Sequence, residues 1–162
     1  MDANLPLSAA SDAGFPWLSL IVLLPAAAAL LMPLLPGEDQ NTSPVPRNLT
    51  IAVLLADLGL MIAAFSRHYD PLESQLQLVE RVSWVPAIGL EWSLGADGLS
   101  APLVVLSGLV TLLTVCASWN ITHKSRLYFA LLLVQASAQA LVFLSQDFLL
   151  FFLAWELELV PV

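Results

Sequence analysis

The stretch from Phe148 to Val162 constrains the fold more than any other part of the sequence. It is almost wholly apolar, yet it carries two carboxyl side chains, Glu156 and Glu158, and no basic residue. Asp147, directly before it, suits the N-cap of a helix that starts at Phe148. With a rise of about 1.5 Å per residue, Glu156 lies about 12 Å beyond Phe148, near the middle of a hydrocarbon layer about 30 Å thick. The stretch therefore predicts a membrane helix with an ionisable group near its centre.

An ionisable side chain at that depth costs a few kcal/mol, so such residues commonly mark functional sites and often proton relays. We predict that Glu156 is a proton relay. The alternative is a structural carboxyl that stays protonated and hydrogen-bonded to a neighbouring helix. Because residues two positions apart on a helix point about 200° away from each other, Glu156 and Glu158 cannot share a proton on one face.

The composition indicates a membrane protein. Hydrophobic residues make up 59% of the sequence and charged residues 11%, far from the average of soluble domains. Several long apolar runs predict an all-α protein that spans a lipid bilayer several times. A net charge of −8 argues against nucleic acid as a partner, because nucleic acid is bound through Lys and Arg. The single cysteine, Cys116, argues against a disulfide or thiolate metal site within the chain.

The sequence divides into four parts. Residues 1–14 are small, polar and acidic and predict a flexible tail. Residues 15–65 hold two transmembrane helices, residues 66–98 an extramembrane loop, and residues 99–162 three more helices. The last helix is shorter than the roughly 20 residues that a crossing needs, so we expect it to be the truncated helix of a longer protein. The predicted spans are 15–35, 48–65, 99–119, 126–144 and 148–162.

The loop at 66–98 carries the pattern of a β-hairpin. Apolar side chains recur with period two on both sides of a turn candidate, Pro86 to Gly89, although Glu80 interrupts the first run. We expect the hairpin to lie against the membrane surface; the alternative is an irregular loop with two interfacial tryptophans. The apolar residues are Leu76, Leu78, Val82 and Trp84 before the turn and Leu90, Trp92 and Leu94 after it.

A second acidic residue, Asp57, lies near the centre of the second span. One interpretation is a proton site or a partner for a basic group elsewhere. The other is a protonated acid bonded to a nearby hydroxyl or carbonyl, and of the two we favour this structural one.

Polar side chains also fall in the third and fourth spans. In the third, hydroxyl residues follow helical spacing and share one face, which suits helix packing. In the fourth, glutamines are predicted on one face, with Gln139 within reach of the helix of Glu156. The hydroxyl residues are Ser107, Thr111, Thr114 and Ser118, and the glutamines are Gln135, Gln139 and Gln146.

Basic residues are denser in the short loops than in the long one. The regions 38–47 and 120–126 hold Arg47, Lys124 and Arg126, whereas the long acidic loop holds Arg67 and Arg81. The positive-inside rule then predicts that the N-terminus and the hairpin lie outside.

Five short motifs, in this order along the chain, resemble one family. It is the family of antiporter-like membrane subunits of respiratory complex I, and the doubled Glu-x-Glu is most similar to chain 4 (D-type) of the photosynthetic NAD(P)H–plastoquinone oxidoreductase of cyanobacteria and chloroplasts. The motifs are Phe15-Pro16-Trp17-Leu18, Gln77-Leu78-Val79-Glu80, Asp97-Gly98-Leu99-Ser100, Ser125-Arg126-Leu127 and Trp155-Glu156-Leu157-Glu158-Leu159-Val160-Pro161.

The resemblance implies the N-terminal portion of a proton-translocating subunit, a translocase part with no redox centre and no cofactor of its own. Plastoquinone, the donor NAD(P)H or ferredoxin, and iron–sulfur clusters would be bound elsewhere in the complex. It places the key glutamate at Glu156, paired with a lysine on a later helix that this chain does not contain, and gives Glu158 a secondary role.

The resemblance also implies surroundings. The membrane would be the thylakoid, with the N-terminus in the lumen, and other membrane subunits would be contacted through the spans and the hairpin, with lipid around the rest. Two alternatives stay open: a subunit of a cation/proton antiporter, and a structural fragment that transports nothing.

Overall fold

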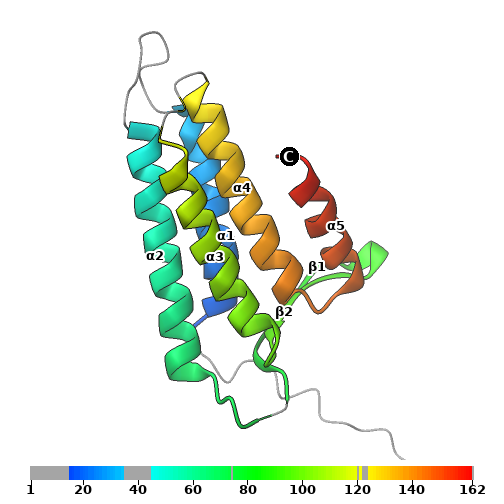
Figure 1. Cartoon of the computed structure of the whole chain (residues 1–162). Coiled ribbons are helices and arrows are strands. Elements are labelled where there is room, and N and C mark those ends of the chain that lie inside the picture. Colours follow the sequence, from blue (N-terminus) through cyan, green and yellow to red (C-terminus); the bar gives the residue numbers. More distant parts are fainter. Residues whose placement is uncertain (1–14, 35–44, 74, 120, 122–123, 162) are drawn as a thin grey trace, which may run out of the picture.

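The computed structural model describes residues 15–34, 45–73, 75–119, 121 and 124–161, so the predicted tail at 1–14 lies outside the described residues. Its helices form an antiparallel bundle, and a two-stranded sheet lies across one end (Figure 1). The elements are α1 (Trp17–Leu31), the 3₁₀ helix η1 (Met32–Leu34), α2 (Val45–His68), β1 (Gln77–Val85), the 3₁₀ helix η2 (Pro86–Ile88), β2 (Leu90–Ala96), α3 (Ser100–Ala117), α4 (Ser125–Leu144) and α5 (Phe148–Leu159).

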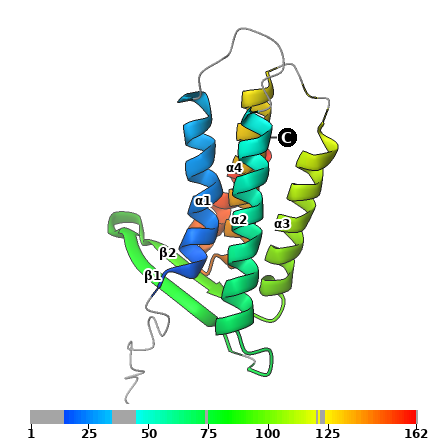
Figure 2. The same ribbon diagram turned by 90° about the vertical axis from the view of Figure 1, so that its left-hand side faces the viewer.

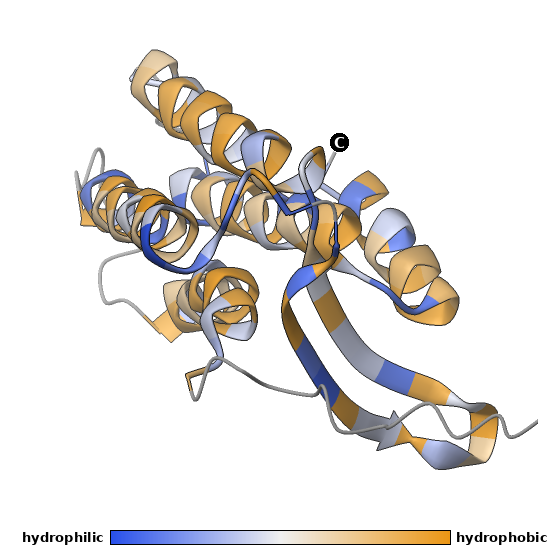
Figure 3. Ribbon diagram, turned by 90° about the horizontal axis from the view of Figure 1, so that it is seen from below, coloured by the Kyte–Doolittle hydropathy of each residue, from blue (hydrophilic) through white to orange (hydrophobic). Residues whose placement is uncertain are grey.

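Four helical stretches of the described chain are long and apolar enough to cross a membrane. The predicted fold class, an all-α multispanning protein with a hairpin between its second and third helices, is therefore confirmed. Figure 3 shows apolar residues along the helices and many of the hydrophilic ones in the hairpin and the turns. α5 has 12 residues, a length of about 18 Å. The four stretches are Trp17–Leu34, Val45–His68, Ser100–Ala117 and Ser125–Leu144.

α2 extends beyond the predicted span 48–65 at both ends. The sequence predicts a loop up to residue 47, but Pro46 lies in the first turn of α2, where the missing N–H of proline costs nothing. At the other end the helix continues through Arg67 and His68, and cationic side chains in a last turn interact favourably with the helix dipole.

α4 is the central helix, because it packs on α1, α2, α3 and α5. Small side chains let α1 and α4 approach closely: Ala28 and Ala29 of α1 and Ala136 and Ala140 of α4 are all buried.

The buried apolar side chains form two clusters at different depths of the bundle. The hairpin-end cluster joins all five α-helices to β2. The far-end cluster joins the four helices α1, α2, α3 and α4. The hairpin-end cluster holds Leu18, Ile21, Val22, Met61, Ala64, Leu90, Leu94, Ala96, Ala101, Val104, Ala140, Leu141, Leu144, Leu150 and Ala154, and the far-end cluster holds Ala28, Ala29, Met32, Leu54, Val115, Phe129, Leu133 and Ala136.

The predicted hairpin is present: β1 and β2 pair antiparallel. Its turn is the predicted one, with η2 closed by Gly89, whose φ of 71° lies in the left-handed region that favours glycine. Figure 2 shows the hairpin beneath α1, with its turn beyond the helices. Near that turn the large apolar side chains of Val82, Trp84 and Ile88 are exposed.

A β-bulge interrupts the predicted alternation in β1. Gln77 pairs with Ala96 and Glu80 with Leu94, so β1 has one residue more than β2 between these pairs. Leu78, inside the bulge, has a φ of 54°, a conformation that is energetically unfavourable for a residue other than glycine. Because one extra residue reverses the side to which the following side chains point, the period-two pattern does not continue through Glu80.

Glu80 instead reaches the first turn of α1. Its carboxylate accepts hydrogen bonds from the backbone N–H groups of Leu18, at 2.7 Å, and Ser19, at 2.9 Å, and from the hydroxyl of Ser19. The indole N–H of Trp92 donates to the same hydroxyl at 2.8 Å. The N-cap of α1 is Pro16, whose side chain makes no capping bond. The carboxylate therefore satisfies free N–H groups of α1 and complements its dipole. We call these contacts the Glu80 clamp.

The second strand is tied to the turn between α4 and α5. Leu94 forms an isolated β-bridge with Ser145, and the N–H of Gln146 donates to the carbonyl of Ser93 at 2.8 Å. The side-chain amide of Gln146 donates to the carbonyl of Gly95 at 3.4 Å. The hairpin is thus attached to the start of α1 by one strand and to the start of α5 by the other.

The cap of α3 is the one that the sequence predicts. Asp97 Oδ1 accepts hydrogen bonds from the N–H groups of Ser100, at 2.6 Å, and Leu99, at 3.0 Å. The bond from the Ser100 N–H is the main cause that lowers the pKa of Asp97. A lowered pKa stabilises the fold above the pKa of the unfolded chain, and this contribution is lost as the pH falls through the folded pKa.

We predict that Glu80→Ala lowers the free energy of unfolding by about 2 kcal/mol, because it removes a helix cap and leaves N–H groups of α1 unpaired. Glu91→Ala is the matched control, since Glu91 is an exposed carboxylate on the other strand. Thermal unfolding of the full-length protein in detergent measures both. Equal melting temperatures for the two variants would show that the Glu80 clamp adds no stability.

Candidate functional site

α5 carries the two carboxyl groups that the sequence singles out. It starts at Phe148, and the predicted cap is present, because Asp147 Oδ1 accepts a hydrogen bond from the N–H of Leu150 at 2.8 Å. The buried residues of α5 are Leu150 and Ala154, four positions apart. They mark the face that packs on α4 and β2.

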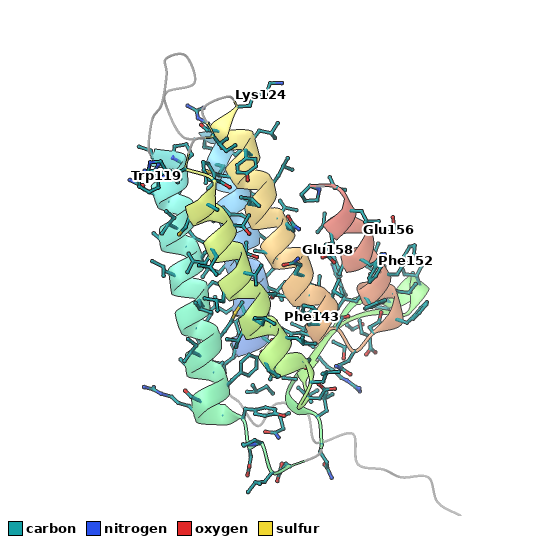
Figure 4. The ribbon with its side chains drawn as sticks, in the orientation of Figure 1. Trp119, Lys124, Phe143, Phe152, Glu156 and Glu158 are labelled. Carbon is teal, nitrogen blue, oxygen red and sulfur yellow. The ribbon has the colours of Figure 1, made fainter. Side chains whose placement is uncertain are left out.

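Glu158 lies four positions after Ala154 and therefore on the same side of α5. Its side chain is half-buried, whereas Glu156 is exposed. Figure 4 shows Glu158 on the side of α5 towards α4 and Glu156 on the outward side. The two carboxyl groups point to different sides, as their spacing predicts.

No basic residue lies on α5 or near the middle of a spanning helix. Arg47 and Arg67 lie in the end turns of α2, Arg81 in β1, and Lys124 and Arg126 at the start of α4. A carboxylate within a bilayer needs a cation or hydrogen-bond donors nearby. The described helices supply no such cation to Glu156.

A groove of about 290 Å³ lies between α3 and α4. Ser107, Thr111 and Thr114 line it from α3, which confirms that these hydroxyl residues share a face, and Gln135 and Gln139 line it from α4. Each hydroxyl donates to a carbonyl three or four residues earlier on α3, at 2.9 Å. Within the described residues the two glutamine side chains form no such bond, so their amides need donors and acceptors from elsewhere.

Two polar residues assigned to these faces lie just beyond the ends of the helices. Ser118 is the C-cap residue of α3. Its hydroxyl donates to the carbonyl of Thr114 at 2.7 Å, as the other hydroxyl residues of this face do one turn earlier, and forms a second hydrogen bond of 2.7 Å with the hydroxyl of Tyr128. Gln146 lies beyond the end of α4 at Leu144 and is held by β2, so its predicted place on the face of Gln139 is wrong. The reach of Gln139 to α5 stays a prediction.

Asp57 is enclosed in the bundle. It is 2% exposed, and its Oδ1 has no hydrogen-bond partner among the described residues. Leu54 and Met61, one turn before and after it, are buried on the same face of α2. Because α5 packs on α4 and β2, the structure does not bring Asp57 together with Glu156 and Glu158. The described residues also hold no group of three His, Cys, Asp or Glu that could bind a metal ion.

Sequence reasoning missed the role of Glu80, which among the described carboxylates makes the most hydrogen bonds to a distant part of the chain. A signal was present, since a charged residue interrupts an otherwise apolar alternation in β1. The hydrogen-bond partner of Glu80 could not be predicted, because the N-terminus of α1 lies about sixty positions away in the sequence.

These features define the class of protein. The chain is an integral membrane protein with four candidate spans, an anchored hairpin, and a capped fifth helix that carries two carboxyl groups.

Comparison with known proteins identifies the family. Residues 75–145 match the family model described as NADH-ubiquinone oxidoreductase chain 4, amino terminus. Over 148 residues, or 91% of this chain, the sequence is 57% identical to NAD(P)H-quinone oxidoreductase chain 4 1 of a Synechococcus strain and 56% identical to that of Synechococcus elongatus. It is 51% identical to the corresponding chain of a Nostoc strain over the same length.

The resemblance seen in the motifs is therefore confirmed: the chain matches the N-terminal portion of NAD(P)H-quinone oxidoreductase chain 4. It spans 27% of the length of these relatives and corresponds to their N-terminal portion.

We predict that Asp147→Ala frays the first turn of α5 at a cost of about 1 kcal/mol, because the N–H of Leu150 loses its acceptor. Asp147→Asn is the control, since asparagine caps helices about as well as aspartate. Hydrogen exchange of the peptide that starts at Phe148, followed by mass spectrometry, should speed up in the alanine variant alone. Unchanged exchange in both variants would contradict a stabilising cap.

Proposed function

We propose that this chain is the start of a proton-translocating, antiporter-like subunit of a complex I-type NAD(P)H–quinone oxidoreductase. The observation that carries the proposal is an exposed carboxyl group, Glu156, on an apolar helix, with no cation on the described helices to neutralise it. The match to chain 4 of NAD(P)H-quinone oxidoreductases supports the assignment to that complex.

Glu156 would work as a switch. A cation from a helix outside the described residues would stabilise its carboxylate, and withdrawal of that cation would favour uptake of a proton. The outward position of Glu156 suits such a partner, because α4 and β2 cover the opposite side of α5. Glu158, which faces α4, would have the secondary role of receiving or passing on the proton.

Electron transfer would take place in other subunits. Plastoquinone, NAD(P)H or ferredoxin, and iron–sulfur clusters would be bound there, and this chain would couple their reaction to proton movement without a cofactor of its own. Neighbouring membrane subunits would contact the spans and the hairpin. The exposed apolar side chains of Val82, Trp84 and Ile88 support the hairpin as one such contact.

The membrane would be the thylakoid, with the hairpin end in the lumen. The distribution of charge supports this orientation. At the opposite end Arg47, Lys124 and Arg126 gather, and the guanidinium of Arg47 stacks over the ring of Trp119 at 3.8 Å from its centroid. Such an excess of Lys and Arg in short loops marks the cytoplasmic side.

The proposed role predicts that Glu156→Gln abolishes proton pumping while the complex still assembles, because glutamine keeps the shape and polarity but exchanges no proton. Pumping coupled to quinone reduction, measured in membranes carrying the full-length protein, should fall by at least about tenfold. Glu91→Gln, on the exposed hairpin, serves as the control. If pumping persists in Glu156→Gln, Glu156 is structural. If the only effect of the substitution is that the complex no longer assembles, Glu156 has a role in assembly and not in transport.

The orientation predicts which cysteine variants a membrane-impermeant maleimide labels. In a Cys116→Ser background, Lys124→Cys should react in sealed thylakoid vesicles with the cytoplasmic side outward, because Lys124 lies at the far end of the bundle. Leu72→Cys, at a position that is 92% exposed at the hairpin end, should react only after the vesicles are opened. The reverse pattern would place the hairpin in the cytoplasm.

A further inference from the structure

The two apolar clusters of the bundle are separated by a layer of polar groups. On α2 Asp57 falls between Leu54 of the far-end cluster and Met61 of the hairpin-end cluster. On α3 Thr111 falls between Val115 and Val104 in the same way. Both polar side chains are buried.

α1 and α4 contribute to the same layer. Ser137 of α4 lies between Ala136 of the far-end cluster and Ala140 of the hairpin-end cluster, and its buried hydroxyl donates to the carbonyl of Val22 on α1 at 2.7 Å. We call this set the polar layer: Asp57, Thr111, Ser137 and the Val22 carbonyl.

The register between α2 and α3 places Asp57 beside Thr111. A side chain at Gly108 would meet the sulfur of Met61 at 3.0 Å, so these two residues face each other across the two helices. The helices are antiparallel, and one turn further along each of them lie Asp57 and Thr111. The faces buried against Asp57 from α1, α3 and α4 carry no other titratable side chain in the described residues.

The polar layer is rich in acceptors and poor in free donors. The hydroxyl of Ser137 donates to the carbonyl of Val22, and the hydroxyl of Thr111 donates to the carbonyl of Ser107. Asp57 Oδ1 has no partner in the described residues. An ionised carboxylate in such a place has no donor to stabilise it, whereas a carboxylic acid is itself a donor.

Thr111 belongs both to the polar layer and to the lining of the α3–α4 groove. It is 7% exposed, and its oxygen keeps acceptor capacity after donating to Ser107. Beyond it, the amides of Gln135 and Gln139 face the groove and need partners, which water can supply. Thr111 is therefore the polar residue that lies both at the depth of Asp57 and on the lining of the groove, although no hydrogen bond joins it to Asp57 in the described residues.

We propose that Asp57 is a second proton-binding site, filled from the α3–α4 groove through the hydroxyl of Thr111. The exchange is balanced: Asp57 gives its O–H proton to water in the groove, and water returns a proton to the carboxylate. The proposal is independent of the role proposed for Glu156, because Asp57 is buried on α2 whereas Glu156 lies on the exposed side of α5.

The test is infrared difference spectroscopy of the full-length protein in its purified complex, moved from H₂O to D₂O. The spectrum of wild type minus Asp57→Asn should contain the C=O band of a protonated carboxylic acid, and this band should shift on deuteration. In Thr111→Val the shift should slow by about tenfold, the effect of one lost hydrogen bond on a rate.

Thr114→Val is the matched control, because Thr114 lines the same groove and makes the same bond to its own helix but is not buried in the polar layer. In Thr114→Val the acid band should shift as fast as in wild type. Thr111→Ser, which keeps a hydroxyl group, should exchange at the wild-type rate. Absence of an Asp57-dependent acid band overturns the proposal. So does equal exchange in the two valine variants, which would mean that the groove is dry or that protons arrive by another route. If Asp57→Asn does not assemble, ¹³C labelling of aspartate in wild type and Thr111→Val gives the same readout.

Discussion

The carboxylate of Glu80 is the contact on which the arrangement of this chain depends. It caps α1 from β1, and β2 in turn binds the turn that starts α5. The first and last helices are therefore positioned by the same two strands. The strained backbone at Leu78 lies in the bulge that precedes Glu80, and a clamp worth a few hydrogen bonds can offset such strain.

Features set by neighbouring residues follow directly from the sequence. The spans follow from apolar runs, the caps at Asp97 and Asp147 from a short polar side chain before such a run, and the hairpin from alternation around Pro86 to Gly89. The extra turns of α2 and the partner of Glu80 did not follow. Pro46 is compatible with a loop or with a first helical turn, and only packing selects between them.

In the candidate site, too, some features follow from the sequence and others only from packing. Glu156 and Glu158 point to different sides by helical geometry alone, and the structure adds that Glu158 is the one that faces α4. The polar layer was not predictable, because it depends on how helices are aligned in depth. The position of Met61 opposite Gly108 shows that alignment for α2 and α3, and no local sequence pattern predicts it.

The alignment also relates the polar layer to α5. Thr111 lies eleven residues after the start of α3, Gln135 nine before the end of α4, and Glu158 ten after the start of α5. At 1.5 Å per residue, each of the three lies about 14 to 17 Å from the terminus of its own helix at the hairpin end. Asp57 is level with Thr111 by the register of α2 and α3. Carboxyl groups on α2 and α5 are thus separated sideways, not in depth, with the groove glutamines between them. A charge moved between groups at one depth does no work against the membrane potential, so the arrangement of these carboxyl groups places no electrical barrier between α2 and α5.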